Sequence, residues 1–332
     1  MSDAWAALRD GAGRVNRAPA LLFGVWALTL AVTALPAAVM ARTIARDLGQ
    51  SLEADAAAEG INDEWLQEFS ERQGGLASTL RPTILGFGAV LDNLGALADG
   101  APRPAPVVAI GAAYVGVWLF LAGGIIDRYA RDRATHAYGF FAACGVFFFR
   151  FLRLAAGQAI VYGALFWLLH PWLFDRVYPR LVAAESTAGS AVAVRVAFYL
   201  VFGALAAAAN LVFDYAKVRA VVEDRRSMAG ALAQSLGFVR RNTAAAAALY
   251  VADAALLAVA MAAYAALAPG VGRGGLVWAV LAVGQLFVAV RLWIKLLFWA
   301  SETALFQARL AHAGYVAGRE PVWPDSPAAE AL

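Results

Sequence analysis

Residues 276–298 read LVWAVLAVGQLFVAVRLWIKLLF, an apolar run interrupted only by Gln285, Arg291 and Lys295 among its strongly polar positions. A helix needs about 20 mainly apolar residues to cross about 30 Å of hydrocarbon, because its backbone polar groups must be satisfied within the helix. Five further stretches match this run in length and apolar character, namely residues 21–40, 107–126, 154–174, 191–213 and 243–268. The sequence therefore predicts an all-α fold, a polytopic transmembrane helical bundle of about six spans.

The composition agrees with a membrane protein. The chain is 62% hydrophobic and 15% charged, whereas soluble domains are about half apolar and about a quarter charged. Its formal net charge is +3, but the basic residues are spread around the span ends and do not gather on one face, which argues against nucleic-acid binding. The expected partners are membrane lipids, with anionic headgroups on the cytoplasmic side.

The distribution of basic residues predicts the orientation, because positively charged loops stay on the cytoplasmic side. One set of loops is clearly richer in them: Arg9, Arg14, Arg17, Arg128, Arg131, Arg133, Arg150, Arg153, Lys217, Arg219, Arg225, Arg226, Arg240 and Arg241. We therefore expect both termini to be cytoplasmic. A cleaved secretory signal at residues 21–40 is the alternative, but this run is longer than a signal core of about 7 to 15 residues, which favours an uncleaved helix.

These assignments divide the chain into a cytoplasmic N-terminal segment (1–20), the first span (21–40), an extracytoplasmic helical loop (41–106), a bundle of spans 2 to 6 (107–315) and a disordered cytoplasmic tail (316–332). In the loop, Asn62 is typical of a helix N-cap and Gly74 of a stop, with Trp65, Leu66 and Phe69 on the apolar face between them.

A second helix is expected over residues 82–98, where Ile84, Phe87, Leu91 and Leu94 form one apolar stripe. The stripe favours packing against the protein's own helices, and a position on the outer membrane surface is the alternative.

Two cytoplasmic connections share one plan. They are DRYARDRATHAYGFFAACGVFFFRFLRL (127–154) and DYAKVRAVVEDRRSMAGALAQSLGFVRRN (214–242). In the first, residues 138–149 are too short to cross a membrane and Arg150 separates them from the next run, which predicts an interfacial helix. In the second, an interfacial helix is expected with Gln234 and Ser235 off its apolar face, which comprises Met228, Leu232, Leu236 and Val239. Two explanations of this likeness remain open. The connections are either an internal duplication or two independent segments that solve the same topological problem in a similar way.

The strings RVNRAPALLFGVWALTL (14–30), FLAGGIIDRYARDRATHAYGFFAACGVFFFRFLRL (120–154) and DYAKVRAVVEDRRS (214–227) resemble those of bacterial polytopic membrane proteins of unknown function. The chain is also similar, more distantly, to membrane regions found beside glycerophosphodiester phosphodiesterase domains. A catalytic domain of that kind is absent from the sequence. The resemblance thus implies a bacterial cytoplasmic-membrane protein and supplies no site residues.

Known catalytic motifs are missing. The sequence contains no GxxxxGK[ST] phosphate loop, HExxH zinc motif or GxSxG elbow. His136, His170 and His312 are dispersed, which argues against a shared metal site, and the single cysteine, Cys144, excludes an internal disulfide. We expect no enzyme activity, no cofactor and no metal.

Asp253 is the strongest functional lead, because a carboxylate near the middle of a span is costly unless it is paired, hydrated or protonated. At 1.5 Å per residue it lies roughly 15 Å from the cytoplasmic end, and Arg291 lies about 9 to 11 Å from the same side, within reach of an ion pair. The candidate intramembrane polar cluster comprises Asp253, Arg291, Gln285, Asn210 and Gln158. Lys295, one turn beyond Arg291, is expected to reach the cytoplasmic interface.

Two functions remain open. The first is a non-catalytic membrane protein acting in envelope organisation, lipid handling or assembly, in which the polar residues only fasten helices together. The second is a transporter or permease component whose polar site lies around Asp253 and Arg291. The last helix is also expected to continue past residue 298 into the cytoplasm, because no Pro or Gly interrupts it.

Overall fold

The computed structural model describes residues 2–59, 62–80, 87–183, 188–267 and 277–310 of the chain. Six helical stretches among these residues are long and apolar enough to cross a membrane. They are Pro19–Leu48, Ala105–Arg131, Ala137–Val182, Gly189–Val222, Thr243–Leu267 and Trp278–Arg309. The predicted all-α, six-span architecture is confirmed, and most of the helices extend well beyond the apolar runs that predicted them.

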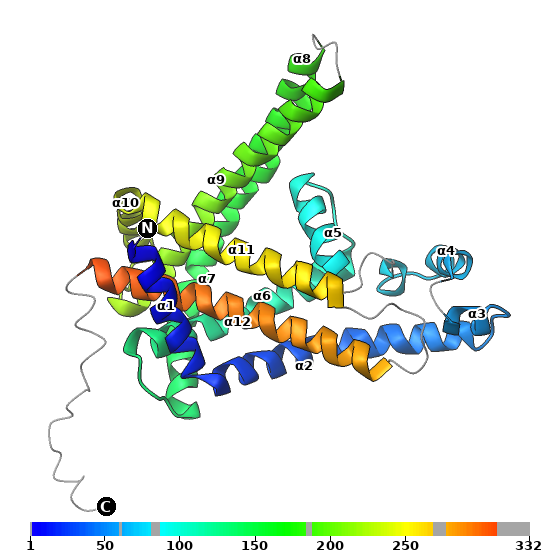
Figure 1. Cartoon of the computed structure of the whole chain (residues 1–332), viewed down its shortest axis with the longest axis horizontal. Coiled ribbons are helices and arrows are strands. Elements are labelled where there is room, and N and C mark those ends of the chain that lie inside the picture. The colour runs from blue at the N-terminus through cyan, green and yellow to red at the C-terminus, as the bar shows by residue number, and fades with distance from the viewer. Residues whose placement is uncertain (1, 60–61, 81–86, 184–187, 268–276, 311–332) are drawn as a thin grey trace, which may run out of the picture.

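The elements follow one another as α1 (Ser2–Asn16), α2 (Pro19–Leu48), α3 (Ala54–Glu59), α4 (Asp63–Arg72), η1 (Ala77–Thr79), α5 (Phe87–Ala98), α6 (Ala105–Arg131), α7 (Ala137–Ala164), η3 (Leu165–Leu169), η4 (Trp172–Val177), α8 (Tyr178–Val182), α9 (Ala188–Val222), α10 (Met228–Arg241), α11 (Thr243–Leu267) and α12 (Val277–Arg309). Figure 1 shows that α9 and α8 rise steeply away from α2, α11 and α12.

The packed core lies at one end of the bundle, which contains α1, α10 and the C-terminal turns of α12 and is called the α1 end below. Buried apolar side chains gather there, whereas the far parts of the same helices expose theirs, among them Leu200, Val259 and Trp278. Apolar side chains that the chain leaves uncovered are what lipid requires of a membrane-spanning surface. The buried set at the α1 end includes Tyr129, Phe151, Tyr215, Phe238, Leu296, Leu297, Leu305 and Phe306.

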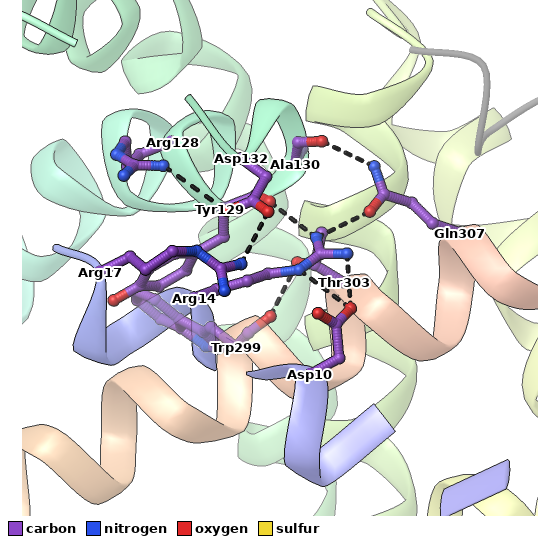
Figure 2. Close-up of polar contacts among 10 residues, drawn as sticks. All are labelled: Asp10, Arg14, Arg17, Arg128, Tyr129, Ala130, Asp132, Trp299, Thr303 and Gln307. Carbon is purple, nitrogen blue, oxygen red and sulfur yellow. Dashed lines mark hydrogen bonds and ion pairs between the residues drawn. The ribbon is translucent and has the colours of Figure 1, made fainter. Parts of the chain in front are cut away.

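The N-terminal segment forms a helix, α1, that packs along the C-terminal half of α12. Gly11 permits this approach, because a Cβ at that position would lie 2.7 Å from the backbone nitrogen of Ser301. Figure 2 shows Arg14 of α1 at the centre of the contact. Its Nη1 donates to the Tyr129 carbonyl at 2.7 Å and to Gln307 Oε1 at 2.8 Å. These bonds join α1, α6 and α12.

The prediction of a separate interfacial helix at residues 138–149 is wrong. One continuous helix, α7, runs from Ala137 to Ala164, and the helical path continues through two π-helical turns, η3 and η4, into α8. Arg150 does not interrupt it, because Arg150 Nη1 pairs with Asp224 Oδ1 beyond the C-terminus of α9 and the guanidinium lies 5.0 Å from the Phe147 ring centroid. A paired arginine is compatible with a helix interior.

Two glycines let α6 and α7 pack closely. A Cβ on Gly123 would lie 2.7 Å from Phe147 Cβ, and one on Gly124 would lie 2.6 Å from Cys144 Sγ and 2.8 Å from the Phe140 carbonyl oxygen. Small residues at helix interfaces are the usual means of close approach in membranes.

The helix predicted in the connection 214–242 forms as α10 but packs differently from the prediction. Ser227 caps it by accepting a bond from the Gly230 N–H at 3.2 Å. Ser235 is fully buried and Leu236 is exposed, which reverses their predicted placement. The helix packs mainly on α9 and lies against α7 and α11 as well, so the chain itself covers much of its apolar surface.

In the loop between the first two spans, α4 forms where the sequence predicted it. The Asn62 side chain accepts a bond from the Trp65 N–H at 3.1 Å, and the helix ends at Arg72, just before Gly74. Trp65 and Phe69 are buried against the outer end of α2, and Trp65 Nε1 donates to Asp47 Oδ2 at 2.9 Å.

The second outer helix, α5, lies between α11 and the arm formed by α8 and α9 (Figure 1). His170 Nε2 lies 2.7 Å from the Ala98 carbonyl oxygen at its end, and the Tyr199 hydroxyl bonds to Asp99. Leu91 and Leu94 are each about half exposed, at 51% and 52%. These two residues of the stripe are therefore only half covered by the chain, and Ile84 and the side chain of Phe87 lie outside the described residues.

Candidate functional site

A cavity of about 510 Å³ lies among α2, α6, α11 and α12. Its polar lining comes from four helices: two threonines lie on α2, a tyrosine on α6, a carboxylate on α11, and a glutamine and two cations on α12. The residues that carry these groups are Thr29, Thr33, Tyr114, Asp253, Gln285, Arg291 and Lys295. Pockets of about 300 to 1,000 Å³ are typical of small-molecule sites.

Asp253 lies on the otherwise apolar helix α11. Its Oδ1 atom is shielded from solvent and has no hydrogen-bond partner. Asp253 and Arg291, both described, line the same cavity without forming the expected ion pair. The cavity separates the two side chains. The ion pair that we expected from their similar depths is therefore wrong.

Lys295 does not extend to the cytoplasmic interface as predicted. Its ammonium lies 3.4 Å from the centroid of the Trp118 ring and within 6 Å of two further rings, at 5.6 Å from Tyr114 and 5.8 Å from Trp299. A cation over an aromatic face is attracted by the ring quadrupole, most strongly over tryptophan. The aromatic side chains of α6 and α12 thus hold this cation inside the bundle at the wall of the cavity.

Gln285 and Arg291 complete the polar wall on α12. Gln285 Oε1 accepts a bond from Trp26 Nε1 at 3.1 Å, which joins α12 to α2. The Arg291 guanidinium lies 5.6 Å from the Phe287 ring centroid, and the residue is exposed toward the outside of the protein. Arg291 therefore lies at the mouth of the cavity.

Gln158 and Asn210 form a separate polar group between α7 and α9. Gln158 Nε2 donates to Asn210 Oδ1 at 3.4 Å, and Asn210 Nδ2 donates to Asp214 Oδ2 at 2.8 Å. Lys217 Nζ donates to the other oxygen of Asp214 at 2.7 Å. The five predicted cluster residues thus fall into two groups: Asp253, Gln285 and Arg291 line the cavity, whereas Gln158 and Asn210 fasten two helices.

Two further charged residues on α12 lie near these groups, and the sequence interpretation missed the second, Glu302. Lys295 is within electrostatic range of Asp214 and Lys217. Glu302, one heptad beyond Lys295 on α12, is fully buried, and neither of its carboxylate oxygens has a hydrogen-bond partner. The spacing of seven residues places both on one face of α12, a signal that was present in the sequence.

The histidines do not assemble a metal site. His170 is buried, bonds to Ala98 and stacks on Phe174 with ring centroids 4.5 Å apart, whereas His136 precedes α7 at its N-cap position. His312 lies outside the described residues. Across the described residues, no group of three His, Cys, Asp or Glu side chains has the arrangement that would hold a metal ion.

Comparisons with known proteins identified no relative. No family model matches the chain, and neither a curated protein nor a solved structure matches it.

Proposed function

We propose that this protein is a non-catalytic transporter or permease component that binds a small organic anion in the cavity around Asp253. The observation that carries the proposal is the cavity itself, which brings Arg291, Lys295 and Asp253 to one space within the membrane-spanning helices. Ionisable residues at this depth mark substrate or proton pathways when they face a cavity.

The charges suggest how the anion is held. Arg291 at the mouth and Lys295 on the wall attract a negative group, and the Lys295 ammonium is already stripped of much of its water by the aromatic rings. Asp253 supplies an acceptor without a partner, which suits a proton or a positive group that travels with the anion. Transport linked to a proton therefore fits the cavity better than simple anchoring of helices does.

The location follows from the same helices. We place the protein in a bacterial cytoplasmic membrane with the α1 end and both termini on the cytoplasmic side, because arginines of the predicted cytoplasmic set, including Arg14, Arg128 and Arg219, gather at that end. The resemblance to bacterial polytopic membrane proteins supports this location. Reporter fusions at the N-terminus and after residue 310 test it, and a signal from outside the cell at either position would contradict it.

Transport is tested with purified protein in liposomes that contain a pH-sensitive dye. The panel of organic anions is lactate and succinate, each measured for uptake and for its effect on the melting temperature. We expect at least one anion to enter and to raise the melting temperature, because a ligand that binds only the folded state stabilises it. Asp253→Asn and Arg291→Gln should each abolish uptake.

Gln158→Leu is the matched control, since Gln158 is also an intramembrane polar residue but lies outside the cavity. It should leave uptake unchanged. The proposal is overturned if no anion of the panel binds or enters, or if Gln158→Leu lowers uptake as much as Asp253→Asn at equal amounts of folded protein.

Lipid handling is the second candidate. A groove at the α1 end, lined by residues of α2, α6 and α7, favours this function. Asp253 does not line that groove.

A further inference from the structure

A groove of about 380 Å³ opens beside the first turns of α2 at the α1 end. Its apolar wall is formed by Leu21, Leu28, Leu121 and Phe141, from α2, α6 and α7. Arg17 and Arg128 lie at its polar end, together with the Thr135 hydroxyl group in the connection between α6 and α7. The groove is therefore apolar along most of its length and carries two cations at one end.

Arg128 is the unusual member of this lining. Its side chain is only 9% exposed, and its Nη1 is shielded from solvent without a hydrogen-bond partner. The acid that faces it is Asp132, whose Oδ2 accepts a bond from Arg17 Nη2 at 2.7 Å. Its Oδ1 is 4.0 Å from Arg128 Nη1, too far for a hydrogen bond. Figure 2 shows both arginines approaching this one carboxylate. Two guanidinium groups thus share a single negative charge, and Nη1 of the more buried one has no hydrogen-bond acceptor.

The length of the groove matches one leaflet of a membrane. Its α2 wall runs from Pro19 to Leu28, which spans about 14 Å at 1.5 Å per residue. Half of a hydrocarbon core of about 30 Å is about 15 Å. A molecule with an acyl chain along α2 would therefore place its polar group beside Arg17 and Arg128.

Gly24 keeps the middle of the groove open. A Cβ at this position would have no atom of the surrounding chain within 4 Å. The glycine is therefore not required for close helix packing, in contrast to Gly124. Because Gly24 lines the groove, we expect a larger side chain there to occupy the space of the acyl chain.

We infer that this groove binds an anionic phospholipid of the cytoplasmic leaflet, with the phosphate between Arg128 and Arg17 and one acyl chain along α2. Arginine suits this ligand, because its planar guanidinium donates two parallel bonds to phosphate oxygens. A phosphate would also give Arg128 Nη1 the acceptor that Asp132 does not provide. Free inorganic phosphate shares the polar chemistry but leaves the apolar length unused.

The test measures lipid retention by the full chain, purified in detergent and examined by native mass spectrometry. Phosphatidylglycerol and phosphatidylcholine are added separately, and inorganic phosphate is the third probe. We expect one phosphatidylglycerol to remain bound under conditions that remove phosphatidylcholine. Arg128→Gln should weaken phosphatidylglycerol binding about tenfold or more, since hydrogen bonds to charged groups contribute about 1.5 to 3 kcal/mol.

Gly24→Leu provides a second variant that does not touch a charge. It should prevent lipid retention while the melting temperature of delipidated protein stays unchanged. Arg131→Gln is the matched control, because Arg131 ends the same helix but pairs with Asp127 Oδ1 at 2.8 Å and lies outside the groove.

Equal retention of the two lipids, full retention by Gly24→Leu, or the same loss in Arg131→Gln as in Arg128→Gln would each overturn the inference. Inorganic phosphate that bound as tightly as phosphatidylglycerol would overturn it as well, because the apolar groove would then contribute nothing. Anion uptake through the Asp253 cavity is measured separately, so either proposal can fail alone.

Discussion

Arg14 at the α1 end and Lys295 beside the cavity are both largely buried cations, and they are held in opposite ways. Arg14 donates to Asp10, Tyr129 and Gln307, so its charge and its hydrogen-bond donors are satisfied by the chain. Lys295 lies against aromatic rings with no ion pair to any described residue. A buried charge whose partners all come from the chain fixes helices in place. A buried charge without an ion pair beside a cavity is available to a ligand.

The same contrast separates the two ends of the helices. At the α1 end, small residues and hydrogen bonds bring the backbones together, whereas the helices around Asp253 leave a cavity between them. Stability should therefore depend on the α1 end and ligand binding on the cavity. Substitutions at each place test this division.

Gly124→Leu should have the largest effect. A side chain at Gly124 would collide with Cys144 Sγ and with the Phe140 carbonyl oxygen, and a backbone atom cannot move aside cheaply. We expect the variant to yield little or no folded protein, measured as the monodisperse fraction in size-exclusion chromatography. Gly116→Leu on the same helix is the control, since nothing lies within 4 Å of its added Cβ. Equal yields for the two variants would show that α6 and α7 do not pack as described.

Arg14→Ala should have the next largest effect. It leaves the Tyr129 carbonyl and Gln307 Oε1 without the Arg14 donor, and a buried polar group that loses its partner costs about 1 to 3 kcal/mol. We expect the free energy of unfolding to fall by about 3 kcal/mol in a denaturant titration in detergent. Arg9→Ala, at an exposed position of the same helix, should change it very little. Similar losses in both variants would contradict the central role of Arg14.

The sequence predicted the features that depend on residues close together in the chain. The six spans follow from local runs of apolar residues, and the Asn62 cap is satisfied by the N–H group of Trp65, three positions away. The role of Arg14 could not be predicted in this way, because its partners Tyr129 and Gln307 are 115 and 293 positions distant.

The errors have the same origin. Arg150 was expected to end a helix because arginine is costly in lipid, but its partner Asp224 lies 74 positions further along the chain. The depths of Asp253 and Arg291 were deducible from residue counts, and these residues do line one cavity. Whether their side chains meet depends on helix rotation and spacing, which hydropathy does not determine.

Lys295→Met should have a smaller effect on stability than Arg14→Ala. The substitution removes a cation–π contact with Trp118 that is worth about 0.5 to 2 kcal/mol, but it also removes the cost of burying an ammonium that has no direct ion pair. These terms oppose each other, so we expect a net change below about 1 kcal/mol in the same titration. A loss as large as that of Arg14→Ala would assign Lys295 a structural role and remove the contrast between the two cations.

Gln158→Leu should have the smallest effect. Interhelical hydrogen bonds in membrane proteins contribute about 0.6 kcal/mol on average, and the bond from Gln158 to Asn210 is long, at 3.4 Å. Asn210 Oδ1 also keeps the Tyr162 hydroxyl within 3.5 Å. Asn210→Leu should cost more, because the buried carboxylate of Asp214 then loses its donor at 2.8 Å. If the two variants were equally stable, the polar group between α7 and α9 would not fasten these helices as described.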